Sequence, residues 1–172
     1  MKLFSECGLI HPTPISKLIV NNNRMPKIRL TKEFSFEMAH VLEGYDGPCK
    51  NVHGHSYRLF VTVIGEPNPD ATSPKYGMVM DFGHLKAIVK KLVIDRFDHV
   101  LMIKSDNKIL SHQYAHTLGK IECVDYQPTC ENLLHHIAQL IAKELPPEVK
   151  LYHLKLHETA TSYAEWFATD NE

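Results

Sequence analysis

The chain has 172 residues, 44% of them hydrophobic, which fits one globular domain with a substantial core. Its 19 basic and 20 acidic side chains nearly cancel, which argues against a general attraction to nucleic acid or to an anionic membrane. No apolar run approaches the roughly 20 residues of a membrane span. The four cysteines form no C-x-x-C pair, so we expect reduced thiols and a cytoplasmic protein.

The first 25 residues show little periodicity. They hold three prolines or glycines and a run of three asparagines at 21–23, and nothing in them points to chemistry. We therefore expect residues 1–25 to be a poorly ordered extension, followed by a single domain at residues 26–172.

A strand is predicted over residues 27–40, where apolar residues such as Ile28 and Leu30 alternate with polar ones. Residues 44–48 contain two glycines and a proline, which favours a reversal of the chain. Residues 56–66 are rich in β-branched and aromatic side chains and predict a second strand. The two strands are expected to form a hairpin.

Three histidines lie in the two arms of this predicted hairpin. His53 and His55 are separated by one residue, so in an extended chain both imidazoles point to the same face. The hairpin would bring His40, at the end of the first strand, opposite this pair. Three protein nitrogens and one open position are the arrangement of a catalytic zinc site. The competing interpretation is an ordinary surface pair, because the chain has 12 histidines and also contains His135-His136.

A cysteine lies four residues before His53, and its role is left open by the spacing. Cys49 could be a fourth ligand, which would make the metal site structural. It could instead be a nucleophile or base that stays off the metal and is activated beside it.

A helix is predicted after Asp81, which is placed to act as its N-cap. The dipeptide Asp98-His99 follows this helix. A carboxylate beside an imidazole can fix its tautomer and make it a proton shuttle, although the dipeptide alone is weak evidence. The apolar stripe of the helix comprises Leu85, Ile88, Val89, Leu92 and Val93.

Residues 102–127 have no clear period, and a second metal site with His112, His116 and Cys123 is a minor alternative there. A second helix is predicted to begin after Thr129, which would be its N-cap. Glu131 then lies in the first turn, where the helix dipole favours an anion.

Alternation returns over residues 149–157, and residues 162–168 are predicted to form the last strand. Glu158 continues the apolar face of the strand before it, at the edge of a pocket or as an ordinary strand-end glutamate. The predicted order is therefore two strands, two helices and two strands, an α+β fold.

Two motifs carry a family resemblance: F-x-F-x-x-A-H, which ends at His40, and C-x-x-x-H-G-H-x-Y, which runs from Cys49 to Tyr57. They resemble the 6-pyruvoyltetrahydropterin and 6-carboxytetrahydropterin synthase family, zinc enzymes that act on 7,8-dihydroneopterin triphosphate. Asp98-His99, the P-T-x-E-N segment from Pro128 and the segment from Glu158 extend the resemblance over about residues 27–168. The gap of three residues after Cys49 is typical of the 6-carboxytetrahydropterin branch of bacterial queuosine synthesis.

The resemblance implies a tunnelling fold, a four-stranded antiparallel sheet with two helices on one face in the order ββααββ. Such sheets join into an oligomeric barrel with active sites between subunits, so a homo-oligomer built on a trimer, up to a hexamer, is expected. An open sheet with helices on one face independently favours association. Two departures from the family pattern are His84, where an aspartate is usual, and Ala160, where a proline is usual.

The resemblance also implies roles for individual residues. One zinc ion per subunit would be held by His40, His53 and His55. Cys49 would be the base, with Asp98 and His99 as the proton shuttle. Glu158 would hold the pterin ring through paired hydrogen bonds and take part in catalysis, and Thr129 and Glu131 would contact the substrate.

The implied reaction converts dihydroneopterin triphosphate to 6-carboxytetrahydropterin, with release of acetaldehyde and triphosphate. The alternatives are formation of 6-pyruvoyltetrahydropterin and a pterin-binding relative without catalysis. A hydrolase that uses zinc-bound water is a third possibility, but the chain lacks the H-E-x-x-H motif that would supply its base.

Overall fold

The computed structural model describes residues 25–106 and 119–171. The extension predicted for the N-terminus therefore lies outside the described residues, apart from Met25. The minor alternative of a second metal site involving His112 and His116 also falls outside them. None of the helices in the described ranges is both long enough and apolar enough to cross a membrane.

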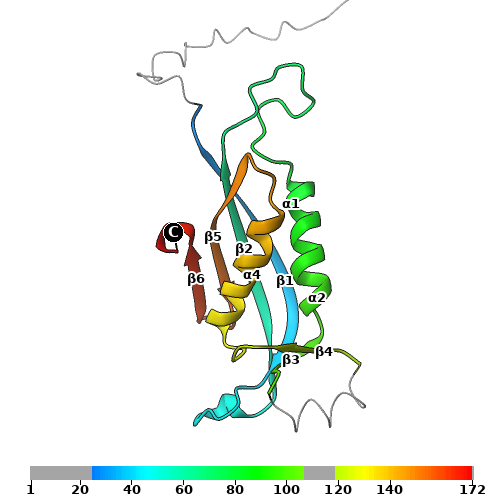
Figure 1. Ribbon diagram of the computed structural model, residues 1–172, viewed down its shortest axis with the longest axis vertical. Helices are drawn as coiled ribbons and strands as arrows, with labels where there is room; N and C mark the ends of the chain where they lie inside the picture. Colours follow the sequence, from blue (N-terminus) through cyan, green and yellow to red (C-terminus); the bar gives the residue numbers. More distant parts are fainter. Residues whose placement is uncertain (1–24, 107–118, 172) are drawn as a thin grey trace, which may run out of the picture.

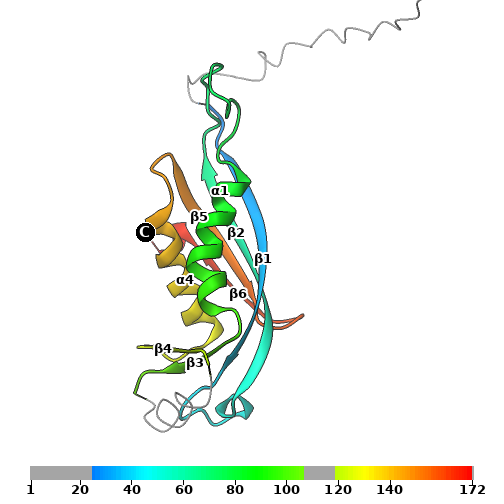
Figure 2. The ribbon, with the colours of Figure 1, turned by 90° about the vertical axis from the view of Figure 1, so that its right-hand side faces the viewer.

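The chain folds into one curled sheet with its two longer helices, α1 and α4, on the same face (Figures 1 and 2). The elements in chain order are β1 Ile28–His40, η2 Pro48–Lys50, β2 His53–Gly65, α1 Phe82–Val89, η3 Lys90–Ile94, α2 Asp95–Phe97, β3 Val100–Lys104, β4 Ile121–Val124, α4 Cys130–Glu144, β5 Val149–His157, β6 Tyr163–Phe167 and η4 Ala168–Asp170.

The sheet has six strands in the order β4-β3-β1-β2-β5-β6. The four predicted strands are present, and β1, β2, β5 and β6 pair antiparallel in that order. The expectation of a purely antiparallel four-stranded sheet was wrong, because β3 pairs parallel with β1 and β4 pairs parallel with β3. Residues 100–103 are all buried, so β3 lacks the alternation that marks a strand with one wet face.

The predicted helix starts are confirmed. The carboxylate of Asp81 accepts a hydrogen bond from the backbone N–H of Gly83 at 2.7 Å, and α1 begins at Phe82. Thr129 Oγ1 accepts from the N–H of Asn132 at 3.3 Å at the start of α4. The first helix continues beyond α1 through the π-helical turn η3 into the short α2, which ends just before Asp98.

The core lies between the helices and one face of the sheet. Alternate residues of β1 and β2 point toward it, and each fully buried apolar side chain contributes about 1.5–3 kcal/mol relative to an exposed one. Its central members are Phe36, Met38, Tyr57, Leu59, Val61, Leu85, Val89, Leu133, Ile137, Ile141, Leu154 and Leu156.

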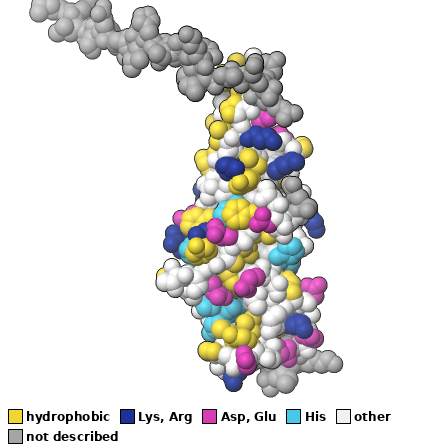
Figure 3. Space-filling model, turned by 90° about the vertical axis from the view of Figure 1, so that its left-hand side faces the viewer, with side chains coloured by type: hydrophobic (Ala, Val, Ile, Leu, Met, Phe, Trp, Pro, Cys, Tyr) yellow, Lys and Arg dark blue, Asp and Glu magenta, His cyan; other side chains and the backbone are white. Residues whose placement is uncertain are grey.

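The surface is mixed in charge, in keeping with the near-zero net charge of the chain. Figure 3, which views the molecule from the left-hand side of Figure 1, shows basic, acidic, histidine and apolar side chains interspersed on this face.

Candidate metal centre and its surroundings

The β1–β2 hairpin places three histidines at one end of the sheet. In the register of the two strands His40 lies opposite His53, and Met38 lies opposite His55, so all three imidazoles share the face that carries the core. Their candidate ligand atoms all lie within 4.8 Å of one another. The hairpin predicted from the sequence is confirmed, and it brings the three predicted metal ligands together.

Backbone carbonyls fix the orientation of two of these rings. Nδ1 of His40 donates to the carbonyl oxygen of Pro128 at 2.7 Å, and Nδ1 of His53 donates to that of Asn51 at 2.8 Å. Each ring is thereby held in the tautomer that carries its proton on Nδ1. The lone pair of Nε2 remains available, as in metal-binding histidines that donate their other N–H to an outer partner.

Two lone pairs consequently face each other. The Nε2 atoms of His40 and His53 are 3.1 Å apart, although both rings already use their protons toward carbonyls. Two nitrogens bound to one tetrahedral zinc at roughly 2.0–2.1 Å would be separated by about 3.3 Å. The donor set and its spacing therefore fit a zinc ion.

Burial favours the neutral form that metal binding requires. His40 is 1% exposed, and its pKa is lowered from the usual value, chiefly by desolvation. The pKa of His55 is also lowered, again with desolvation as the largest cause, while the nearby Glu158 carboxylate acts in the opposite direction.

Cys49 lies in the turn η2 between the two strands and is partly buried. The N–H of Leu42 donates to the Cys49 carbonyl at 3.0 Å, which ties this turn to the end of β1. Among the described residues, the group whose ligand atoms lie within 4.8 Å of one another contains the three histidines and not Cys49. The thiol is therefore not a member of this group of candidate ligands.

Glu158 is directed at the histidines. Its Oε1 atom lies 3.7 Å from Nε2 of His40 and 3.8 Å from Nε2 of His55. The hydroxyl of Tyr57 donates to the same oxygen at 3.4 Å. Burial is the largest cause that raises the pKa of Tyr57 far above its usual range, so this hydroxyl keeps its proton and remains a donor.

Asp98 and His99 form a dyad that is bound to β1. Oδ2 of Asp98 lies 3.1 Å from Nδ1 of His99, while Oδ1 accepts from the N–H of Glu37 at 2.9 Å. That backbone hydrogen bond is the largest cause that lowers the pKa of Asp98. The carboxylate is placed to pair with the His99 ring, and the His99 side chain is 76% exposed.

The dyad is not joined to the three histidines by hydrogen bonding or ion pairing in the part of the chain that the structure describes. The dyad binds only the backbone of Glu37, through the N–H that donates to Asp98 and the carbonyl that accepts from the N–H of His99. No hydrogen bond or ion pair among residues 25–106 and 119–171 joins Asp98 or His99 to the histidine cluster.

The start of α4 lies beside the histidine cluster, because Pro128 binds His40 and directly precedes the cap Thr129. Glu131 is exposed in the first turn of this helix. Cys130 is buried, its Sγ donates to the carbonyl of Leu156 at 3.6 Å, and burial raises its pKa to about 12. This thiol therefore belongs to the packing of the helix.

Tyr57 and the two carbonyl partners of the histidines were missed by the sequence analysis. Tyr57 could have been found, because it lies two residues after His55 on the same face of β2. The carbonyl of Pro128 comes from a distant segment, and no local pattern predicts it.

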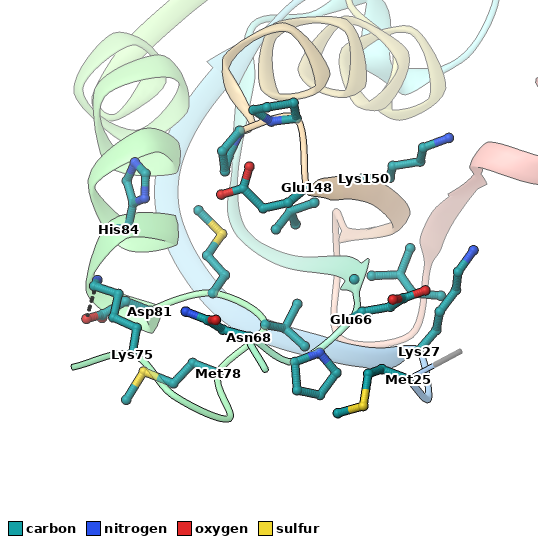
Figure 4. A pocket seen from close by; sticks show the side chains of 18 of the residues that line it. Met25, Lys27, Glu66, Asn68, Lys75, Met78, Asp81, His84, Glu148 and Lys150 are labelled. Carbon is teal, nitrogen blue, oxygen red and sulfur yellow. Dashed lines mark hydrogen bonds and ion pairs between the residues drawn. The ribbon is translucent and has the colours of Figure 1, made fainter. Parts of the chain in front are cut away.

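A cavity of about 600 Å³ lies at the opposite end of the sheet, lined in part by Gly65 and the loop that follows it. Gly65 is at the far end of β2 from His53, about 40 Å away along an extended strand. Figure 4 shows charged side chains of both signs around the cavity, with Lys75 paired to Asp81. None of its lining residues belongs to the histidine cluster.

Comparison with known proteins decides the family. Residues 29–168 match the family described as 6-pyruvoyl tetrahydropterin synthase. The chain belongs to the 6-pyruvoyl tetrahydropterin synthase family. This is a family of lyases, so the chain is assigned as an enzyme.

Similar proteins within the family carry a more specific name. A 6-carboxy-5,6,7,8-tetrahydropterin synthase of Haemophilus influenzae is 36% identical over 140 residues, which cover 80% of this chain and 97% of that protein. A protein of the same name from Rickettsia felis is 31% identical over 141 residues, covering 80% of this chain and 99% of that protein.

Solved structures agree on the fold. The 6-pyruvoyl tetrahydropterin synthase of Caenorhabditis elegans superposes with a TM-score of 0.60 at 26% identity, covering 84% of this chain and 98% of that chain. An uncharacterized protein from Wolinella succinogenes gives a TM-score of 0.68 at 19% identity, covering 83% and 99% of the two chains.

Proposed function

We propose that the chain is a zinc-dependent lyase that converts 7,8-dihydroneopterin triphosphate to 6-carboxy-5,6,7,8-tetrahydropterin, with release of acetaldehyde and triphosphate. The observation that carries this proposal is the histidine cluster, with two Nε2 lone pairs facing each other in a member of this family. The relatives named 6-carboxy-5,6,7,8-tetrahydropterin synthase support the choice of product.

His40, His53 and His55 are the proposed ligands of one zinc ion per subunit. A zinc ion bound there would act as a Lewis acid toward the hydroxyl groups of the substrate side chain. The carbonyls of Pro128 and Asn51 would keep two of the rings in the correct tautomer throughout turnover.

Cys49 is the proposed base. Its turn lies directly between the strands that carry the histidines, and its thiolate would take a proton from a side-chain carbon of the substrate. In this assignment Cys49 stays off the metal, which its absence from the 4.8 Å ligand group supports.

Glu158 is proposed to act at the reacting end of the substrate. Its carboxylate is 3.7 Å from Nε2 of His40, and the amino edge of a pterin lies at the opposite end of the ring system from the carbon that bears the side chain. One carboxylate beside the metal is therefore better placed to accept a hydrogen bond from a side-chain hydroxyl than to hold that edge. Thr129 and Glu131, at the start of α4, remain proposed contacts of the substrate.

Asp98 and His99 are proposed to serve the active site of a neighbouring subunit. The His99 side chain is 76% exposed, and the dyad has no hydrogen bond or ion pair to the histidines of its own chain among the described residues. A homo-oligomer built on a trimer, up to a hexamer, would bring it to a second metal site. The sheet supports association because, among the described residues, β1 pairs with β3 over Met38–His40 alone, which leaves most of that edge of β1 without a partner strand there.

The cytoplasm is the proposed location, and queuosine synthesis is the proposed pathway. Three cysteines of the described residues are free, and a mechanism that uses the Cys49 thiolate needs a reducing compartment.

The experiment that tests the function is product analysis. Purified, zinc-loaded protein is incubated with 7,8-dihydroneopterin triphosphate, and the products are identified by mass spectrometry. We expect 6-carboxytetrahydropterin together with acetaldehyde. A pyruvoyl product would instead assign the sister activity, which the similarity to the Caenorhabditis elegans enzyme makes the second candidate. A zinc-loaded protein that binds the pterin without converting it would contradict the proposal and indicate a binding protein.

A further inference from the structure

One lysine side chain binds the backbone that carries the Asp98–His99 dyad. Nζ of Lys120 donates to the carbonyl oxygen of Asp98 at 2.8 Å and to that of Asp95 at 3.0 Å. These carbonyls belong to α2 and the residue that follows it, at the negative end of the helix, where a cation is favourable.

The peptide group that joins Asp98 to His99 is held at both ends. Lys120 binds its carbonyl oxygen, and its N–H, which belongs to His99, donates to the carbonyl oxygen of Glu37 at 2.7 Å. The orientation of this peptide sets the direction in which the His99 side chain leaves the backbone. His99 adopts a positive φ of 58°, which is uncommon outside glycine and persists only where the surroundings impose it.

The backbone of Lys120, which directly precedes β4, is bound to β3. The N–H of Leu101 donates to the Lys120 carbonyl at 3.2 Å, and the next residue, Ile121, lies opposite Leu101 in the β3–β4 register. Two positions after Lys120, Glu122 pairs with Arg96 of α2, and one of their hydrogen bonds measures 2.9 Å. The β3–β4 pair therefore connects twice to the short helix that ends at the dyad.

We propose that Lys120 is a positioning residue for His99: its ammonium group holds the Asp98–His99 peptide so that the imidazole is presented in one direction. The proposal rests on the proposed catalytic role of the dyad. The proposal assigns a role to the residue directly before β4, in the part of the sequence (residues 102–127) that has no clear period.

The test is a double-mutant cycle with Lys120→Met and His99→Ala, measured on the zinc-loaded protein with 7,8-dihydroneopterin triphosphate. Lys120→Met keeps the aliphatic stem and removes the charge and the three donors. We expect kcat to fall by about 10- to 100-fold, with little change in KM, zinc content or thermal midpoint. In the His99→Ala background the same substitution should change kcat by less than about 2-fold, because its target is already absent.

Two further variants serve as controls. Lys86→Met removes an exposed lysine of α1 that has no side-chain hydrogen bond or ion pair among the described residues, and it should leave kcat unchanged. Lys120→Arg keeps a cationic donor and should retain more activity than Lys120→Met. Should Lys120→Met fail to fold, Lys120→Leu, which also lacks a donor, replaces it in the cycle with the same expectations.

The outcomes separate the two proposals. If His99→Ala is fully active, the role of the dyad fails. If His99→Ala is impaired but Lys120→Met is not, the positioning role fails alone. An equal loss from Lys120→Met in both backgrounds would also overturn it, because a general structural effect does not depend on His99. The 15N chemical shifts of the His99 ring give an independent reading: they should move in Lys120→Met and stay in Lys86→Met.

Discussion

The hydroxyl of Tyr57 lies 3.4 Å from Oε1 of Glu158, although the two residues are 101 positions apart in the chain. The Tyr57 ring is fully buried and packs edge-on against the imidazoles of His40 and His55. Tyr57 thus contacts both the candidate metal ligands and the carboxylate that faces them.

Tyr57→Phe is predicted to separate these two contacts. The phenyl ring preserves the packing against the histidines, so zinc content should be unchanged. Loss of the donor releases Glu158, and kcat should fall by about 10-fold, while the free energy of unfolding falls by about 1 kcal/mol. Steady-state kinetics, metal analysis and urea unfolding measure the three quantities. An unchanged kcat would mean that this hydrogen bond does not position Glu158 for the reaction.

Cys49→Ala is predicted to abolish turnover while zinc stays bound. The reason is geometric: the three histidines form the ligand group without the thiol. Metal analysis of the purified variant and a product assay are sufficient. Cys123→Ala, at an exposed thiol on β4, is the matched control and should behave as the unmodified protein. Loss of zinc from Cys49→Ala would make Cys49 a ligand and contradict its assignment as base.

The fold was predictable where the pattern of apolar residues is periodic. Alternation located β1 and β5, and the β-branched and aromatic content located β2. The last strand was predicted at residues 162–168, where β6 lies, and the two amphipathic stripes and their caps located the helices. The pattern could not locate β3, because residues 100–103 are buried on every side and a uniform apolar run has no period. β4 has four residues, and its parallel pairing with β3 leaves no local signature.

The candidate site was also predictable from the sequence only in part. His53 and His55 were placed on one face by their spacing, and His40 was placed opposite them by the hairpin, because strand register follows from local sequence. The contact of Asp98 with the Glu37 amide joins residues 61 positions apart. Because every residue except proline has a backbone N–H, the sequence does not show which amide a side chain will bind. Contacts to backbone groups are for this reason the part of the site that required the structure.

His55→Asn is predicted to release the metal. It removes one of the three imidazole nitrogens from a partly exposed position, so the fold should persist while zinc affinity falls by more than about 100-fold. Competition with a coloured chelator measures the affinity. His135→Asn is the control, because His135 is exposed on α4 and its one side-chain hydrogen bond among the described residues is with Gln139. Equal affinities for the two variants would exclude His55 as a ligand.

His136 predicts a pH dependence of stability. It lies on α4, with Nε2 3.5 Å from a guanidinium nitrogen of Arg96 in α2, and it packs near the ring of Tyr126. Its pKa is lowered from the usual value, first by desolvation and then by the charge of Arg96. The unfolded chain, with an ordinary histidine pKa near 6.5, therefore binds a proton at a higher pH than the folded chain.

The contribution of His136 to the free energy of unfolding is therefore fully present above the pKa of the unfolded chain. It is lost as the pH falls below that pKa. The urea midpoint should drop between pH 7.5 and pH 5.5, and the drop should be smaller in His136→Gln, which has no ionisable ring. His135→Gln removes the exposed neighbour and should keep the full drop. Because all three proteins carry the same metal ligands, any pH effect of zinc release is common to them and cancels in the comparison. An identical drop in His136→Gln and His135→Gln would show that His136 does not titrate on unfolding.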